Sequence, residues 1–342
     1  MKAMLLKKVG KLERDSTPLE LADVPEPAPG PGEVLIKVSA CCVCHTELDE
    51  IEGRMPPARL PLALGHQVVG RVVVLGADAR RFRTGERVGV AWIFSADQTC
   101  EFCRAGQENL CPQFHATGRD ANGGYAEYIT VGQDFAYPIP AAFSDTEAAP
   151  LLCAGAIGYR SLRLTNLRDG QRLGLTGFGA SAHLVLQLAK YQFPRSPVFV
   201  FARSERERAF AKELGAVWAG DTTDSPPEPL HAIIDTTPAW RPVVEALRNL
   251  APGGRLVVNA IRKEDSDKQA LLALDYPSHL WQEKELKSVA NVTRADVSEC
   301  LALAARIPLK PTVQEYALAD ANRALLDLKQ GRTRGAKVLR VV

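Results

Sequence analysis

Residues 173–182 read LGLTGFGASA, an apolar run that ends in a Gly-x-Gly-x-x-Ala turn. Gly177 and Gly179 let the backbone approach a pyrophosphate closely, and a helix that begins near Ala180 directs its positive N-terminus at the negative charge. The alternative is a tight turn without a ligand, but a strand before the glycines and a helix after them are the context that the motif requires. The stretch therefore predicts a dinucleotide site.

Strands and helices alternate downstream of this turn, as they do in parallel βαβ units. Apolar residues at helical spacing predict a helix that contains residues 182–189. Strands are expected at 198–201, 232–235 and 255–258, and helices at 205–214 and 243–250, the second ending at Gly253 and Gly254. This pattern predicts an α/β fold with a doubly wound parallel sheet.

The first 150 residues have a different pattern, of short β-branched or alternating runs bounded by Gly and Pro. These runs predict strands at 34–38, 68–75, 88–94 and 125–131. After residue 291 we expect a further amphipathic helix and a strand at 338–342. The chain therefore divides into a strand-rich part and a part with alternating strands and helices.

The composition is that of a globular protein with room for two domains, since 46% of the 342 residues are hydrophobic and 24% are charged. The net charge is +2 and the basic residues are spread along the chain, so nucleic acid and anionic membrane surfaces are not expected partners. No apolar stretch approaches the roughly 20 residues of a membrane span, and no cleavable signal is apparent. We therefore expect a cytoplasmic protein.

Three separated residues have the chemistry of a catalytic zinc site. Cys44, His66 and Cys153 supply two thiolates and one imidazole, a set that leaves one coordination position open. A zinc ion with an open position acts as a Lewis acid toward a substrate oxygen. This set predicts an enzyme.

A second, denser cluster follows the spacing Cys100-x2-Cys103-x7-Cys111. Asp97 precedes Cys100 with the same spacing of two intervening residues, and it supplies a fourth ligand for a closed, structural zinc site. The alternative is a group of three free thiols in a site without metal. The prediction is therefore two zinc ions in each chain; Cys41, Cys42 and Cys300 are expected to be small buried residues.

The end of the second strand of the parallel sheet selects between NAD(H) and NADP(H). An enzyme that prefers NAD(H) places an acid there for the adenosine ribose, whereas this chain has Arg203 and Ser204. Both side chains can bind a 2′-phosphate, so NADP(H) is the expected cofactor and NAD(H) the second choice. In the alternative interpretation Arg203 is a solvated surface residue and Glu205 binds the ribose.

The ordered strings Cys44-His45-Thr46, Gly65-His66 and LCAG at 152–155 resemble the zinc-dependent alcohol dehydrogenases of the medium-chain dehydrogenase/reductase superfamily. The turn at 177–183 is similar to a bacterial branch related to cinnamyl and propanol-preferring alcohol dehydrogenases. The resemblance implies a GroES-like catalytic domain at 1–152, a Rossmann domain at 153–290, and a segment at 291–342 that returns to the catalytic domain. It also implies a homodimer or homotetramer.

The same resemblance assigns roles and exposes three departures. It implies that Thr46 accepts the proton of a zinc-bound alcohol and that His45 lies near the cofactor pyrophosphate. It also implies that Trp92 lines the substrate pocket, but a tryptophan in a strand could equally belong to the hydrophobic core. The departures are Gln67, Asp97 and Asp49, which stand where the family usually has Glu, Cys and a proton-relay His. The end of the relay is then expected at Asp49.

The expected reaction is hydride transfer between NADP(H) or NAD(H) and a primary alcohol or its aldehyde, with secondary and aromatic alcohols as further classes. A zinc-independent NADPH reductase of quinones or enones is the alternative. Such a reductase has no need of Cys44, His66 and Cys153, and their presence argues against it.

Overall fold

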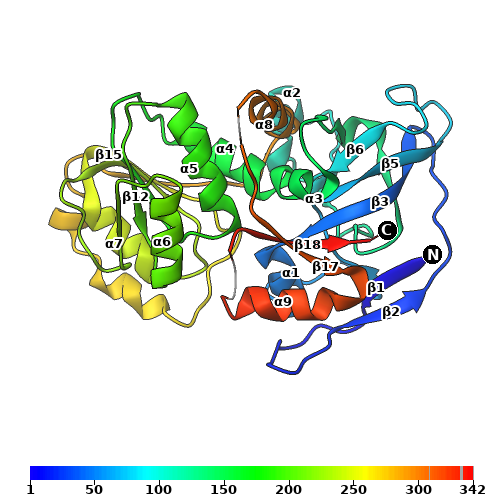
Figure 1. Cartoon of the computed structure of the whole chain (residues 1–342), viewed down its shortest axis with the longest axis horizontal. Helices are drawn as coiled ribbons and strands as arrows, with labels where there is room; N and C mark the ends of the chain where they lie inside the picture. The colour runs from blue at the N-terminus through cyan, green and yellow to red at the C-terminus, as the bar shows by residue number, and fades with distance from the viewer. Residues whose placement is uncertain (308, 332–333, 342) are drawn as a thin grey trace. The chain divides into compact units, whose positions relative to one another are not determined.

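The computed structural model describes residues 1–307, 309–331 and 334–341, which form two compact units. Unit 1 contains Met1–Ala156 and Val292–Val342, and unit 2 contains Ile157–Asn291. The boundary falls within helix α4 (Ala154–Leu164). Figure 1 labels the elements of both units.

Unit 2 is built on a sheet of six parallel strands in the order β13-β12-β11-β14-β15-β16. The strands are β11 (Leu173–Thr176), β12 (Val198–Phe201), β13 (Trp218–Gly220), β14 (Leu230–Asp235), β15 (Leu250–Val258) and β16 (Glu285–Ser288). The connecting helices include α5 (Ala180–Gln192), α6 (Glu205–Glu213) and α7 (Arg241–Asn249). The strand order reverses between β11 and β14, which is the switch point where doubly wound sheets bind ligands.

The predicted C-terminal end of one helix in unit 2 is wrong. The sequence pattern extends the helix through Leu250 to the two glycines at 253 and 254, whereas α7 ends at Asn249 and Leu250 begins β15. Leu250 pairs with Leu230 of β14 and its side chain is buried. A buried apolar residue at a helix end fits both the helical and the strand pattern, so periodicity alone does not place this boundary.

Unit 1 is rich in antiparallel strands. Its largest sheet has seven strands, which are β3 (Glu33–Val43), β5 (Val68–Leu75), β6 (Arg87–Val90), β9 (Tyr128–Gly132), β10 (Ala136–Pro138), β17 (Val313–Ala317) and β18 (Ala336–Arg340). A second sheet contains β1 (Lys2–Leu6), β2 (Leu19–Asp23) and β4 (Leu62–Ala63), and a third pairs β7 (Ile93–Ser95) with β8 (His115–Ala116). The helices are α1 (His45–Ile51), α2 (Glu101–Arg104), α3 (Asp145–Ala148), α8 (Arg294–Arg306) and α9 (Ala321–Lys329).

Two predicted strands of unit 1 have different bounds in the structure. The run at 88–94 is divided between β6 and β7, because the chain leaves the sheet at Trp92. The run at 125–131 begins only at Tyr128, because Tyr125 bonds two other segments, its N–H donating to Leu64 and its carbonyl accepting from Met4. The strand expected at 338–342 is β18, which starts earlier, at Ala336; Val342 lies outside the described residues.

The C-terminal segment completes the large sheet of unit 1. Strand β18, drawn in red in Figure 1, lies antiparallel beside β3, drawn in blue, and β17 pairs with β18. The core under the sheet includes Ile36, Trp92 and Tyr125. Together, the mostly antiparallel sheets of unit 1 and the parallel sheet of unit 2 confirm the α/β fold class expected from the sequence. Within the described residues no helix is both long and apolar enough to cross a bilayer.

Candidate metal and dinucleotide sites

Three segments of unit 1 converge at the first candidate metal site. Cys44 is the N-cap of α1, His66 precedes β5, and Cys153 follows a short 3-10 helix (Ala149–Leu152). Their sulfur and ring-nitrogen atoms lie within 4.8 Å of one another. His66 and Cys153 are buried and Cys44 is half-buried, so the group is sheltered but reachable from one side.

Glu47 supports this group, and the sequence interpretation did not assign it a role. Its side chain is fully buried, with Oε1 2.7 Å from Nδ1 of His66, while Oε2 accepts a hydrogen bond of 2.6 Å from the backbone N–H of Cys44. Nε2 of His66 is buried and has no hydrogen-bond partner among the described residues. A carboxylate on one ring nitrogen orients an imidazole so that the other nitrogen is free to bind a metal.

The signal that identifies Glu47 in the sequence is its place three residues after the N-cap. A Glu at this position reaches back to the N-cap backbone in a capping box. That pattern accounts for one oxygen of Glu47 and not for the contact of the other with His66.

Contacts among the ligand side chains, Glu47 and the buried surroundings shift the pKa values of all three ligands. The pKa of Cys44 is well below its usual value, because Cys153 donates a hydrogen bond to it and His66 lies beside it. That donation and burial raise the pKa of Cys153. Burial alone lowers the pKa of His66, but the charge of Glu47 and the contact with Cys44 raise it well above its usual value. A metal ion that binds thiols and an imidazole takes the place of their protons, so its affinity for this group would depend on pH.

The two candidate relay residues lie on α1. Thr46 is buried, and its Oγ1 is 3.6 Å from Sγ of Cys44. Asp49 is also buried, and it accepts a hydrogen bond of 2.5 Å from Nε of Arg54. Burial raises the pKa of Asp49, and the Arg54 contact opposes that rise. The structure thus places Thr46 beside a ligand and ties Asp49 to an arginine.

Other expected site residues of unit 1 lie near the ligands or on the surface. Trp92 is buried, with its ring edge-on to that of His66 at 5.0 Å between centroids. Gln67 is buried, and its Oε1 lies 3.5 Å from the backbone nitrogen of Ala154, next to Cys153. His45 is exposed at the first position of α1. The roles of His45 and Trp92 stay predictions.

The structure also brings together the second cluster. One ligand atom from each of Asp97, Cys100, Cys103 and Cys111 lies within 4.8 Å of the others. Asp97 Oδ1 accepts hydrogen bonds from the backbone N–H groups of Thr99 and Cys100, at 2.8 and 2.9 Å, and these bonds lower the pKa of Asp97. Burial and Cys100 raise the pKa of Cys103 to about 12. A charged carboxylate beside three sulfurs fits a closed tetrahedral zinc site.

The glycine turn in unit 2 has the geometry that a dinucleotide needs. Gly177 has φ of +77°, and a Cβ there would lie 2.9 Å from atoms of both Thr236 and Thr237. Gly179 is the N-cap of α5, and a Cβ there would meet nothing within 4 Å, so the space above the helix N-terminus is open. Ala180 is the first residue of the helix. The turn thus lies at the sheet switch point with open space beside Gly179, where parallel sheets of this type bind ligands.

Arg203 and Ser204 are exposed between β12 and α6. Ser204 is the N-cap of α6, but its hydroxyl makes no capping hydrogen bond. The carboxylate of Glu207 accepts a bond from the Ser204 backbone and lies near Arg203. Arg208 donates to the carbonyl of Arg203 at 3.1 Å and so fixes the backbone there. Both candidate phosphate-binding side chains are therefore available to a ligand.

Known proteins are similar to this chain in sequence and in fold. Residues 30–141 match the family model described as the alcohol dehydrogenase GroES-like domain. The chain is 45% identical to the probable alcohol dehydrogenase AdhA of Mycobacterium tuberculosis (strain CDC 1551 / Oshkosh), over 95% of this chain and 93% of that protein. The chain belongs to the zinc-type medium-chain alcohol dehydrogenases. An alcohol dehydrogenase of Geobacillus stearothermophilus is 32% identical over 94% of this chain and 96% of its own length.

Solved alcohol dehydrogenases also have this fold. A cinnamyl alcohol dehydrogenase of Sorghum bicolor superposes with a TM-score of 0.85 and 26% identity, covering 99% of this chain and 97% of that one. An NAD-dependent alcohol dehydrogenase superposes with a TM-score of 0.90 and 25% identity, with 100% of each chain covered. The protein is thus an oxidoreductase of the alcohol dehydrogenase type, whose family members use pyridine nucleotides, and the zinc-independent reductase is not favoured.

Proposed function

We propose that this alcohol dehydrogenase is zinc-dependent and transfers a hydride between NADP(H) and a primary alcohol or its aldehyde. The observation that carries the proposal is the Cys44, His66 and Cys153 group, whose ligand atoms lie within 4.8 Å of one another. Nε2 of His66 is buried there and has no hydrogen-bond partner in the described part of the chain. A zinc ion held there supplies a Lewis acid for the alcohol oxygen, and the dinucleotide accepts or supplies the hydride. Secondary and aromatic alcohols are further substrate classes, and NAD(H) is the second cofactor.

Residues of α1 hold and move the alcohol proton in this proposal. The buried Thr46 hydroxyl, beside Cys44, accepts the proton, and Asp49 passes it toward solvent. His45 contacts the cofactor pyrophosphate, and Trp92, packed against His66, forms a wall of the substrate pocket. Residues 1–152 and 291–342 form the catalytic domain, and residues 153–290 form the dinucleotide domain.

A second zinc ion has a structural role, held by Asp97, Cys100, Cys103 and Cys111. All four positions of a tetrahedral ion are then filled by protein, which leaves no place for a substrate. The cytoplasm keeps such thiols reduced, in agreement with the free cysteines of the chain.

The assembly is a homodimer or homotetramer in which one copy covers the sheet edge of another. Strand β16 is at the edge of the parallel sheet, and its four residues are exposed. Leu272, Tyr276, Trp281 and Leu286 of the same unit are also largely exposed apolar side chains. An uncovered edge with apolar neighbours is a site for strand pairing between copies, and the mass of the protein in solution tests it.

The test of the function is a set of initial rates of NADPH and NADH formation, at matched cofactor concentrations, with primary aliphatic, benzylic and secondary alcohols. We expect turnover with primary alcohols that is faster with NADP. Metal analysis of the same preparation should give two zinc ions per chain, one for each ligand group. Absence of turnover with every alcohol contradicts the proposal, and one zinc per chain would mean that the second cluster is a group of free thiols.

Replacement of Arg203 by Ala should raise the KM for NADP and leave that for NAD almost unchanged. The guanidinium supplies charge-assisted hydrogen bonds to a 2′-phosphate, and their loss should raise the KM about tenfold to a hundredfold. Steady-state kinetics with both cofactors measures the effect. Lys212→Ala, which removes the same charge at the other end of α6, is the control. Equal changes with the two cofactors would assign the ribose contact elsewhere, with Glu205 as the first candidate.

A further inference from the structure

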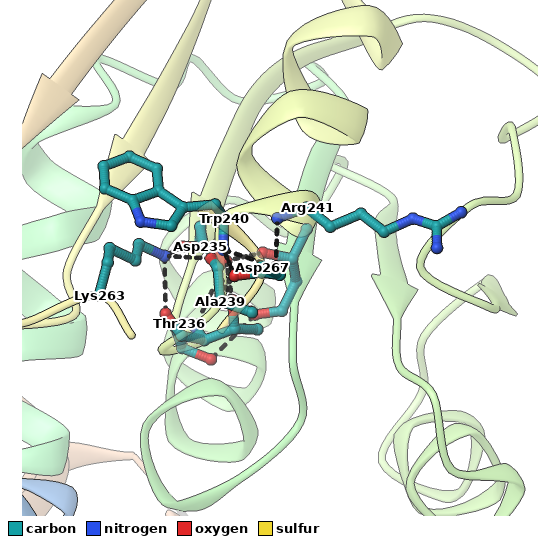
Figure 2. A network of polar contacts seen from close by, with 9 residues as sticks. Asp235, Thr236, Ala239, Trp240, Arg241, Lys263 and Asp267 are labelled. Atoms are coloured by element: carbon teal, nitrogen blue, oxygen red, sulfur yellow. Dashed lines mark hydrogen bonds and ion pairs between the residues drawn. The ribbon is translucent and has the colours of Figure 1, made fainter. Parts of the chain in front are cut away.

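A buried ion pair joins the end of β14 to the segment after β15, and the roles above do not use it. Asp235 is the last residue of β14 and is fully buried, and the side chain of Lys263 is 8% exposed. Figure 2 shows the Lys263 ammonium directed at the carboxylate, with an ion pair between Nζ and Oδ2 of Asp235. Both residues belong to unit 2.

The ammonium of Lys263 also holds the loop after β14. It donates to the carbonyl oxygens of Thr237, at 2.7 Å, and Ala239, at 3.0 Å. A lysine ammonium has three N–H donors, and here a carboxylate and two carbonyls accept from them. Lys263 is thus a clamp across residues 235–239.

The clamped loop lies against the glycine turn. Asp235 pairs in register with Thr176, the residue before Gly177, and the Thr176 hydroxyl donates to Asp235 Oδ1 at 2.5 Å. Thr236 donates through its N–H and its hydroxyl to the carbonyl of Thr176, at 3.0 and 2.9 Å. The close approach of Thr236 and Thr237 to Gly177 permits no side chain at that glycine. The loop therefore forms a wall of the switch-point crevice.

The two ends of the loop are fixed by other contacts. The backbone N–H of Asn259 donates to the carbonyl of Asp235 at 3.0 Å. The carboxylate of Asp267 accepts from the N–H groups of Trp240 and Arg241, at the start of α7. Between these ends, the carbonyls at 237 and 239 are bonded by Lys263. The Thr237 hydroxyl also donates to Asp235 Oδ1 at 2.8 Å, and the N–H of Glu264 donates to the carbonyl of Pro238 at 2.7 Å. Loss of Lys263 therefore removes two of the bonds that hold the middle of the loop beside Gly177, together with the ion pair to Asp235.

We propose that Lys263 is a positioning residue for the dinucleotide. By holding residues 236–239 against the glycine turn, it keeps the crevice in the form that binds the cofactor, and so sets cofactor affinity without touching the substrate. Preorganised loops bind more tightly because less ordering is needed on binding. The inference rests on the proposed use of a dinucleotide by this site.

The experiment is a fluorescence titration of the full-length protein with NADPH and with NADH, together with steady-state kinetics. Lys263→Met should raise the Kd for both cofactors about tenfold, with little change in kcat at saturating cofactor or in the KM for the alcohol. Lys263→Arg keeps the charge and the donors, and it should restore most of the affinity. A lysine with a structural role alone predicts no such division between Kd and kcat.

Lys284→Met is the matched control. Lys284 also donates to two carbonyls of unit 2, those of Leu247 and Ser278, at 3.0 and 2.7 Å. It precedes β16, whereas Lys263 follows β15, so Lys284 belongs to the amino ends of these parallel strands and Lys263 to their carboxyl ends. We expect Lys284→Met to bind both cofactors as the unaltered chain does.

Lys263→Met leaves the buried carboxylate of Asp235 without its ion-pair partner, and this loss can destabilise the folded state. The double variant Asp235→Asn with Lys263→Gln removes both charges and carries the same expectation. A folded variant of either kind that binds NADPH as tightly as the unaltered chain overturns the inference, and so does equal weakening by Lys284→Met. If the unaltered chain binds neither NADPH nor NADH, the proposed function itself is overturned. If the unaltered chain binds them and the Lys263 variants bind them equally well, only the inference about Lys263 is overturned.

Discussion

Cys153→Ala should reduce turnover of every alcohol by at least about 10³-fold, because it removes one of only three protein ligands of the catalytic zinc. A zinc Lewis acid contributes several kcal/mol to the stabilisation of developing charge, and each 1.36 kcal/mol is a factor of ten in rate. Metal analysis should show the zinc content fall from two ions per chain to one. Binding of NADPH should be unchanged, since the dinucleotide turn belongs to the other unit.

Cys300→Ala is the control for this variant. Cys300 is fully buried, burial raises the pKa of its thiol to about 12, and it belongs to neither ligand group. A Cβ on Gly155, two residues after Cys153, would lie 3.5 Å from Sγ of Cys300, so both cysteines occupy the same part of unit 1. Full zinc content and normal rates in Cys153→Ala would remove Cys153 from the ligand set.

Glu47→Ala should weaken zinc binding and lower turnover by about 10- to 100-fold, the usual cost of losing a carboxylate that orients a ligand histidine. The variant removes the contact of 2.7 Å with Nδ1 of His66 and the bond to the Cys44 backbone. Competition with a chromogenic chelator measures the affinity. The zinc affinity of Glu47→Gln should lie between those of Glu47→Ala and the unaltered chain, because an amide oxygen still accepts a hydrogen bond from Nδ1 but has no charge.

Glu50→Gln provides the comparison for a buried acid on the same helix. Glu50 is fully buried, both of its carboxylate oxygens have no hydrogen-bond partner among the described residues, and burial raises its pKa well above the usual value. An amide keeps the size of this side chain, and Glu50 belongs to neither ligand group, so zinc affinity should remain normal. Equal losses in Glu47→Ala and Glu50→Gln would mean that any change in the core of α1 disturbs the metal.

The fold class follows from the sequence because its signals are local. Hydrophobic periodicity and the glycine turn predicted the parallel sheet, and β12 has the predicted bounds. Strand β16 was not predicted, since all of its residues are exposed and it contains no alternating apolar pattern. Leu250 was placed in the preceding helix instead of in β15, because a buried apolar residue is compatible with both a helix and a strand.

The candidate ligands were selected by residue type and by the strings around them, and their convergence depends on packing that no spacing specifies. The spacing of two intervening residues between Asp97, Cys100 and Cys103 is local, and it predicts a cluster directly. Glu47 and Lys263 were missed because each acts through a residue distant in sequence, His66 and Asp235 respectively. Their roles become visible only when strands and helices are placed together.

The position of β18 beside β3 has a consequence for the order in which the newly made chain folds. All strands of unit 2 are consecutive, so this unit can fold on the ribosome as soon as residue 291 has emerged. Unit 1 needs β17 and β18, which are translated after the whole of unit 2, and until then β3 has β5 and β9 beside it but lacks β18. The candidate metal thiols at 44, 100, 103, 111 and 153 are all made before that point. The nascent chain therefore carries these sulfurs in an unfinished unit until β18 is made, and their oxidation during this interval would remove candidate metal ligands.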